Sequence, residues 1–202
     1  MATLDTYKTI SKPSQEVLFK DKNSKFYGFA FPIISEDDVK HHIETLKKKH
    51  YNARHWCYAY QLGIENIRYR ANDDGEPNNS AGMPIYGQIQ SFEVTNILIV
   101  VVRYFGGVKL GVSGLINAYR TAAQMALEDA EIIEKTVDSH FNLTFDYKDL
   151  SKVQRIIKDY GAGILNQKFE ADCEIKFAIR KSKSDEIFNY FENFYGVTVK
   201  RL

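Results

Sequence analysis

The chain has 202 residues, of which 44% are hydrophobic and 26% are charged, which is an ordinary composition for a globular protein. Its length suffices for one large domain or two small ones. The formal net charge of +1 excludes a polycationic chain, so any contact with nucleic acid requires a local basic patch.

The first part of the chain predicts strands on both sides of one helix. Residues 16–34 hold two apolar stretches around a turn at residues 21–23, which predicts a hairpin. Ser35 followed by Asp38 is a helix-start signal, and the apolar period after it predicts a helix over residues 35–50. Aromatic content and alternation predict further strands over residues 55–63 and 66–71.

The middle of the chain combines a long polar loop with its most apolar segment. Residues 72–82 read as a loop, and Pro84 suits the first turn of a short helix that runs to residue 92. Residues 96–102 lack alternation, which predicts a central strand covered on both faces. A helix is predicted from Val112 to Glu134, and its alanines imply that it lies close to the sheet.

The pattern restarts after residue 135. Strand, helix, two strands, helix and strand are predicted over residues 139–147, 148–161, 163–180, 183–196 and 197–202. This β-α-β-β-α-β order is that of the ferredoxin-like unit. We therefore predict an α/β (α+β) chain with two domains, residues 1–135 and 136–202.

The chain shows no targeting or membrane-spanning segment by its sequence pattern. The first residues lack the basic and apolar regions of a secretory signal. The longest aliphatic run, Ile97 to Val102, is far shorter than the ~20 residues that span a bilayer. Two distant cysteines, Cys57 and Cys173, offer neither a disulfide framework nor a zinc spacing. We therefore expect a cytoplasmic protein with no membrane partner.

The glycine-rich segment (residues 103–115, RYFGGVKLGVSGL) joins the apolar strand to the following helix and has two interpretations. Gly106 and Gly107 can turn successive N–H groups inward as a nest for an anion. A helix start favours negative charge, and Arg103 and Lys109 flank it. Alternatively, the glycines only permit a tight turn and close packing, and spacing alone favours this second interpretation. The segment matches neither a Walker loop nor a dinucleotide-binding motif.

The polar loop brings Asp73, Asp74 and Glu76 within four residues. Carboxylates at this density could bind Mg²⁺, but the same residues are also common turn chemistry, which we favour. His55 and Cys57 share one face of their strand, although a small buried cysteine is the commoner explanation than a nucleophilic pair. No hydrolase or metalloprotease motif occurs. The sequence therefore predicts no catalytic residue, no metal site and no cofactor.

Trp56, Tyr58 and Tyr60 lie on the opposite face of the strand that carries His55. An open sheet face with aromatic and basic side chains can stack single-stranded bases. The alternative, which we favour, is that these rings fill the core.

Three stretches, ARHWCYAY, DDGEPNNSAGMPI and RYFGGVKLGVSGLINAY, resemble the IMPACT family, including its bacterial YigZ-type members. The resemblance runs from about residue 18 to residue 130. It implies an N-terminal domain like the second domain of a small-subunit ribosomal protein, as also found in elongation factor G before a ferredoxin-like domain. Eukaryotic members act by protein binding in the control of translation initiation. The chain departs from the family pattern at Asn78–Ser80, where the family usually has Ser-Gly-Thr, and at Ser113, where it has glycine.

The sequence favours binding over catalysis, in translation or RNA metabolism. The expected partner is RNA, or a protein associated with the ribosome or translation, held at a glycine-rich basic anion site. Its residues are Arg103, Tyr104, Gly106, Gly107, Lys109, Gly111 and Gly114. The alternatives are an Mg²⁺-dependent hydrolase or phosphotransferase that uses the same site, and a module that only binds proteins.

Overall fold

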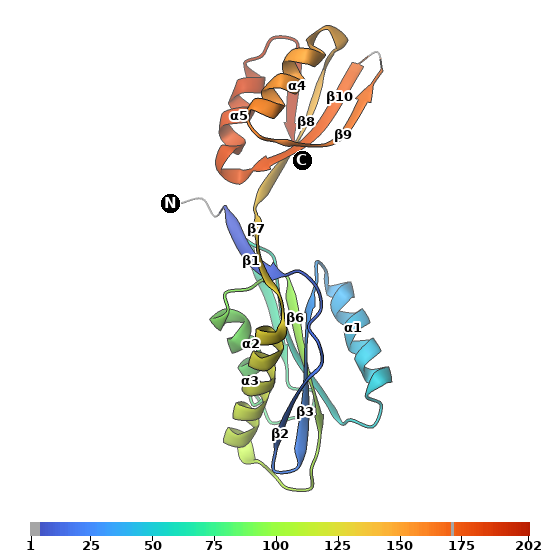
Figure 1. Ribbon diagram of the computed structural model, residues 1–202, viewed down its shortest axis with the longest axis vertical. Helices are drawn as coiled ribbons and strands as arrows, with labels where there is room; N and C mark the ends of the chain where they lie inside the picture. Colours follow the sequence, from blue (N-terminus) through green and yellow to red (C-terminus); the bar gives the residue numbers. More distant parts are fainter. Residues whose placement is uncertain (1–4, 171) are drawn as a thin grey trace. The chain divides into compact units, whose positions relative to one another are not determined.

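The computed structural model describes residues 5–170 and 172–202 (Figure 1). The chain divides into two compact units, residues 7–135 and residues 136–202, the second of which includes Asp5 and Thr6. Within the described ranges, none of the helices combines the length and apolar character needed to cross a membrane.

The first unit is built on a five-stranded antiparallel sheet in the order β2-β3-β6-β4-β5. The strands are β2 (Val17–Asp21), β3 (Ser24–Pro32), β4 (His55–Leu62), β5 (Arg68–Asn72) and β6 (Ile97–Tyr104). The hairpin turn between β2 and β3 places Lys22 and Asn23 at positive φ. Strand β6 is central, and every residue from Ile97 to Val102 is buried. The predicted strand covered on both faces is confirmed.

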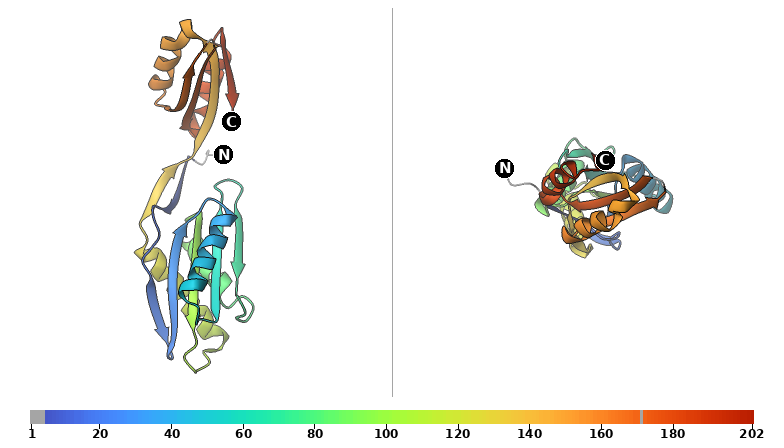
Figure 2. Two further views of the ribbon diagram at one scale, coloured as in Figure 1. Left: turned by 90° about the vertical axis from the view of Figure 1, so that its right-hand side faces the viewer. Right: turned by 90° about the horizontal axis from the view of Figure 1, so that it is seen from above.

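Helices cover both faces of this sheet (Figure 1). Helix α1 (Glu36–Lys49) lies on one face, as Figure 2 also shows, and begins at the predicted capping box of Ser35 and Asp38. Helices α2 (Gly82–Ser91) and α3 (Gly111–Asp129) lie on the other face. A Cβ added to Gly28 of β3 would stand 2.5 Å from the carbonyl oxygen of Ala122. The backbone of α3 therefore lies directly on the sheet, as its alanines predicted.

Two boundaries in this unit differ from the prediction. Helix α3 ends at Asp129 instead of residue 134, and β7 (Ile132–Thr136) follows it. Strand β7 pairs with β1 (Thr6–Ile10), a strand that the sequence did not predict. Ala130 and Ile133 continue the helical period, but hydrogen bonds to the N-terminal segment outweigh it. Helix α2 begins two residues before Pro84, where the Asp73 carboxylate accepts the N–H groups of its start.

The second unit has the predicted ferredoxin-like order. Its elements are β8 (Asp138–Asp146), η1 (Tyr147–Asp149), α4 (Leu150–Asp159), β9 (Gly163–Phe169), β10 (Asp172–Arg180), η2 (Lys181–Lys183), α5 (Ser184–Glu192) and β11 (Val197–Arg201). The sheet order is β11-β8-β10-β9, and all pairs are antiparallel. Helices α4 and α5 cover one face of it and enclose an apolar core centred on Phe141, Phe177 and Phe191 (Figure 1). The α+β fold class is confirmed.

Candidate functional site

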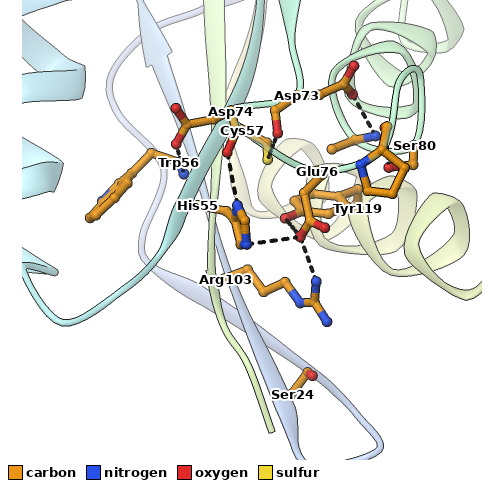
Figure 3. A network of polar contacts seen from close by, with 12 residues as sticks. Ser24, His55, Trp56, Cys57, Asp73, Asp74, Glu76, Ser80, Arg103 and Tyr119 are labelled. Atoms are coloured by element: carbon orange, nitrogen blue, oxygen red, sulfur yellow. Dashed lines mark hydrogen bonds and ion pairs between the residues drawn. The ribbon is translucent and has the colours of Figure 1, made fainter. Parts of the chain in front are cut away.

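The polar loop, the glycine-rich segment and α3 meet at the carboxylate of Glu76 (Figure 3). Arg103, near the end of β6, donates a hydrogen bond from Nη1 to Glu76 Oε1 at 2.6 Å. The hydroxyl of Tyr119, two turns into α3, donates to the same oxygen at 2.8 Å. The three side chains come from three segments that are far apart in the sequence. One buried carboxylate therefore joins the loop, the central strand and the helix.

The pair of Glu76 and Arg103 is removed from water. Only 4% of the Glu76 side chain and 7% of the Arg103 side chain are exposed. The guanidinium lies 5.5 Å from the ring centres of both Phe26 and Phe105. Its Nε is buried and has no hydrogen-bond partner among the residues that the structure describes. Because desolvation of two charges is costly, each member of such a pair depends on the other to remain buried.

His55 stands at the edge of this network. Its Nδ1 lies 2.9 Å from the carbonyl oxygen of Asp74, and because a carbonyl only accepts, this nitrogen carries a proton. Its Nε2 lies 4.0 Å from Glu76 Oε1. Gly75, at a φ of 86°, packs against the imidazole ring. The ring is thus oriented by the backbone of the polar loop.

Cys57 lies on the same face of β4, fully buried. Its thiol donates to the carbonyl oxygen of Asp73 at 3.0 Å. Burial raises the pKa of the Cys57 thiol far above its ordinary range, so the thiolate does not form at neutral pH. His55 and Cys57 are therefore neighbours in the fold, but the cysteine packs as a small hydrophobic residue.

The other two acids of the polar loop hold backbone N–H groups. The Asp73 carboxylate accepts from the N–H groups of Asn79, Ala81 and Gly82 at 2.8 to 2.9 Å. The Asp74 carboxylate accepts from the N–H of Trp56 at 2.7 Å. Within residues 5–170 and 172–202, no group of three or more His, Cys, Asp or Glu side chains is arranged to hold a metal ion. The three carboxylates serve different partners, which does not favour the Mg²⁺ alternative.

The glycine-rich segment combines close packing with exposed surface. A Cβ on Gly106 would collide with the backbone of Asn23, so the segment lies against the β2–β3 turn. Gly107 and Gly111 have φ of 86° and 74° and face open space, whereas Gly114 lies close to Leu110. The first of these contacts matches the turn interpretation. The two open glycines leave backbone accessible to a ligand.

The exposed part of the segment surrounds the start of α3. Lys109 is exposed and has no ion pair within the described part of the chain. The first turn of α3 has neither a side-chain cap nor an acidic residue. Three large apolar residues beside it are about half exposed: Phe105 (50%), Val108 (47%) and Val112 (53%). Tyr104 is instead half-buried, with its hydroxyl 3.1 Å from His50 Nδ1.

The aromatic residues of β4 lie in the layer beneath α1. Tyr60 is buried, and Trp56 and Tyr58 pack partly buried against the core on that face. Lys47 of α1 lies 5.5 Å from the centre of the Trp56 ring. This placement favours the packing interpretation over an open stacking surface.

The sequence did not reveal two members of the network. Tyr119 falls within the helix predicted from Val112 to Glu134 with no role assigned to it, although a tyrosine among alanines carries a hydroxyl that needs a partner when buried. His55 was paired with Cys57 rather than with Glu76. The signal for both was their place in the quoted family stretches, which meet at Glu76.

Comparison with known proteins agrees with the resemblance of these stretches to one family. The model of the Impact N-terminal domain matches residues 22–127, more than half of the chain. The chain belongs to the IMPACT family. A second family model, a domain of unknown function (DUF1949), matches residues 143–188 of this family member.

Relatives of this IMPACT family member share both units. The IMPACT family member of Haemophilus influenzae is 34% identical over 88% of this chain and 87% of its own length. The family member YvyE of Bacillus subtilis is 31% identical over 77% of this chain and 71% of its own. A solved structure, described as that of a hypothetical protein, is 25% identical, with a TM-score of 0.72 and coverage of 99% and 98%.

Proposed function

We propose that this IMPACT family member is a binding protein of translational regulation, and that its glycine-rich segment contacts phosphate groups of RNA. The family supports the regulatory part, since the resemblance implies members that act in the control of translation initiation. The exposed residues of the glycine-rich segment support the proposed contact with RNA phosphate. The observation that carries it is the open first turn of α3 beside Lys109.

Physical chemistry assigns different roles to the two cations of the segment. The first N–H groups of a helix have no internal partner, and the helix dipole favours an anion there. The exposed ammonium of Lys109 and the accessible backbone at Gly107 and Gly111 add to this preference. Arg103 already neutralises Glu76. It therefore positions the segment, and Lys109 makes the contact with phosphate.

A salt series with a labelled oligouridine tests this division of roles. Each phosphate contact to a single strand contributes about 0.7 to the slope of log K against log salt. We expect the Lys109→Ala variant to bind more weakly and with a slope smaller by about 0.7. The matched control is Lys48→Ala, which removes the same charge from an exposed position on α1. Equal slopes in the wild type and the Lys109→Ala variant would refute the proposal.

Binding of a protein is a second candidate for the same segment. Phe105, Val108 and Val112 place three large apolar side chains in solvent, and exposed apolar groups favour protein contacts. This role predicts that the immobilised wild-type chain retains a protein partner from a nuclease-treated translation extract. The immobilised Phe105→Ser variant is expected not to retain that partner. Retention that depends on intact RNA would instead support the phosphate contact.

A further inference from the structure

The sheet of the second unit has one face that α4 and α5 do not cover. Side chains alternate along its strands: in β10, Cys173, Ile175 and Phe177 are buried on the helix side. Glu174 and Lys176 point the other way. Glu174 is half-buried, and Lys176 is exposed. Within the described residues of this unit, no helix or strand packs over that open face (Figures 1 and 2).

The strand register arranges the polar side chains of the open face in rows. Cross-strand partners point to the same side of an antiparallel sheet. Lys200 is opposite Asn142, Asn142 is opposite Lys176, and Lys176 is opposite Asn166. The neighbouring row is Thr198, Thr144, Glu174 and Lys168. The first row therefore alternates ammonium and amide groups across all four strands.

The charge of the open face is unbalanced in the first row. In the second row, Lys168 stands opposite Glu174, so their charges offset one another. Lys176 and Lys200 are exposed and face no carboxylate in their row. A cleft lined by Asn166, Gln167, Lys168, Glu174 and Lys176 opens beside them. The first row therefore attracts an anion, although Asp146 and Asp172 face one another in the row beyond Glu174 and the chain as a whole is close to neutral.

Asn142 lies between these two lysines and favours a ligand that also carries a hydrogen-bond donor. Its Oδ1 is buried and has no hydrogen-bond partner among the described residues. A buried acceptor without a partner is costly, and a ligand that donates a hydrogen bond to it would be favoured. The open face thus combines two unpaired cations with one unfilled acceptor.

We propose that this open face is a second binding surface for single-stranded RNA. Lys176 and Lys200 hold phosphate groups, and Asn142 accepts a hydrogen bond from a ribose 2′-hydroxyl or a base amino group. RNA supplies anions and donors on one strand. The carboxylates of an acidic protein supply only acceptors, so a donor for Asn142 has to come from another group of that protein, whereas each ribose of RNA carries a hydroxyl donor beside its phosphate. The face carries no aromatic side chain in either row, so we expect binding that is salt-sensitive and has little base preference.

The full-length chain and a labelled oligouridine test this surface. The Lys176→Ala/Lys200→Ala variant removes both cations from exposed positions, so the fold is retained, which circular dichroism verifies. We expect its salt slope to fall by about 1.4, the sum of two contacts. The matched control is Lys152→Ala/Lys158→Ala, which removes two exposed lysines from α4 on the helix side. Its slope is expected to equal that of the wild type.

The outcomes separate this surface from the glycine-rich segment. A slope that is the same in the wild type and the Lys176→Ala/Lys200→Ala variant overturns the proposal, whatever the Lys109→Ala variant shows. A fall in both double-lysine variants also overturns it, because the effect is then one of net charge. Polyglutamate of equal charge serves as the competitor. If it displaces the oligouridine as well as unlabelled oligouridine does, the occupant is an acidic protein and the RNA proposal is wrong.

Discussion

Replacement of Arg103 by methionine tests whether the Glu76 network holds the first unit together. Methionine retains an unbranched apolar side chain between Phe26 and Phe105 but removes the guanidinium. Glu76, 4% exposed in its side chain, is then left with the Tyr119 hydroxyl and no cation at 2.6 Å. Removal of one partner from a buried pair costs about 3–5 kcal/mol. We expect a loss of this size in the free energy of unfolding.

Urea unfolding followed by tryptophan fluorescence measures this loss. Trp56 is the single tryptophan of the chain and lies in β4, so the signal reports the first unit alone. The Lys48→Met variant is the control, because exposed substitutions usually change stability by no more than about 0.5 kcal/mol.

A double-mutant cycle separates the charge from the packing. Glu76→Gln in the Arg103→Met background removes the unpaired charge and keeps an acceptor for Tyr119. We expect this double variant to be more stable than Arg103→Met alone, with a coupling on the order of 2–3 kcal/mol. Additive losses, or a loss below about 1 kcal/mol for Arg103→Met, would show that the pair behaves like an exposed one and refute the reasoning.

Two further predictions concern residues beside the network. Gly106→Ala places a Cβ against the backbone of Asn23, so we expect it to lower the stability in urea more than Gly107→Ala does. Gly107 faces open space, and alanine there costs only the strain of a positive φ, about 1–2 kcal/mol. Equal losses would show that the β2–β3 turn moves freely. Because burial raises the pKa of the Cys57 thiol, in a Cys173→Ser background it should react with a disulfide reagent only as fast as the chain unfolds. Rapid labelling of the folded protein at mildly alkaline pH would contradict this.

The parts of the fold that the sequence predicted correctly depend on neighbouring residues. Ser35 and Asp38 are three residues apart and form both hydrogen bonds of a capping box. The unbroken apolar run of β6 could be satisfied only between two covered faces. In the second unit, alternation and the period of α4 suffice to give the strand and helix order. In each case the sequence pattern that decides the element lies within a short stretch of the chain.

The end of α3 shows where such reasoning fails. Ile133 continues the helical period, so a local argument extends the helix past Asp129. The competing interaction is the pairing of β7 with β1, more than one hundred residues earlier in the chain. The N–H of Ser11 donates to the carbonyl oxygen of Glu131, and the N–H of Val137 donates to that of Asp5. Neither strand shows a strong pattern alone, because each is stabilised by the other.

The sequence does not predict the candidate site for the same reason, since the site also depends on residues that are far apart in the chain. Here the consequence for function is larger. From the sequence, Arg103 was a candidate ligand for an anion, and Glu76 was a candidate ligand for a cation. The fold brings them within 2.6 Å, so their charges neutralise one another in a buried position and neither is available to a charged ligand. Under the proposed function, contact with a partner then comes from groups of the glycine-rich segment that remain in solvent. Gly107, Lys109 and Gly111 are such groups, because all three are exposed and follow Arg103 within the same segment.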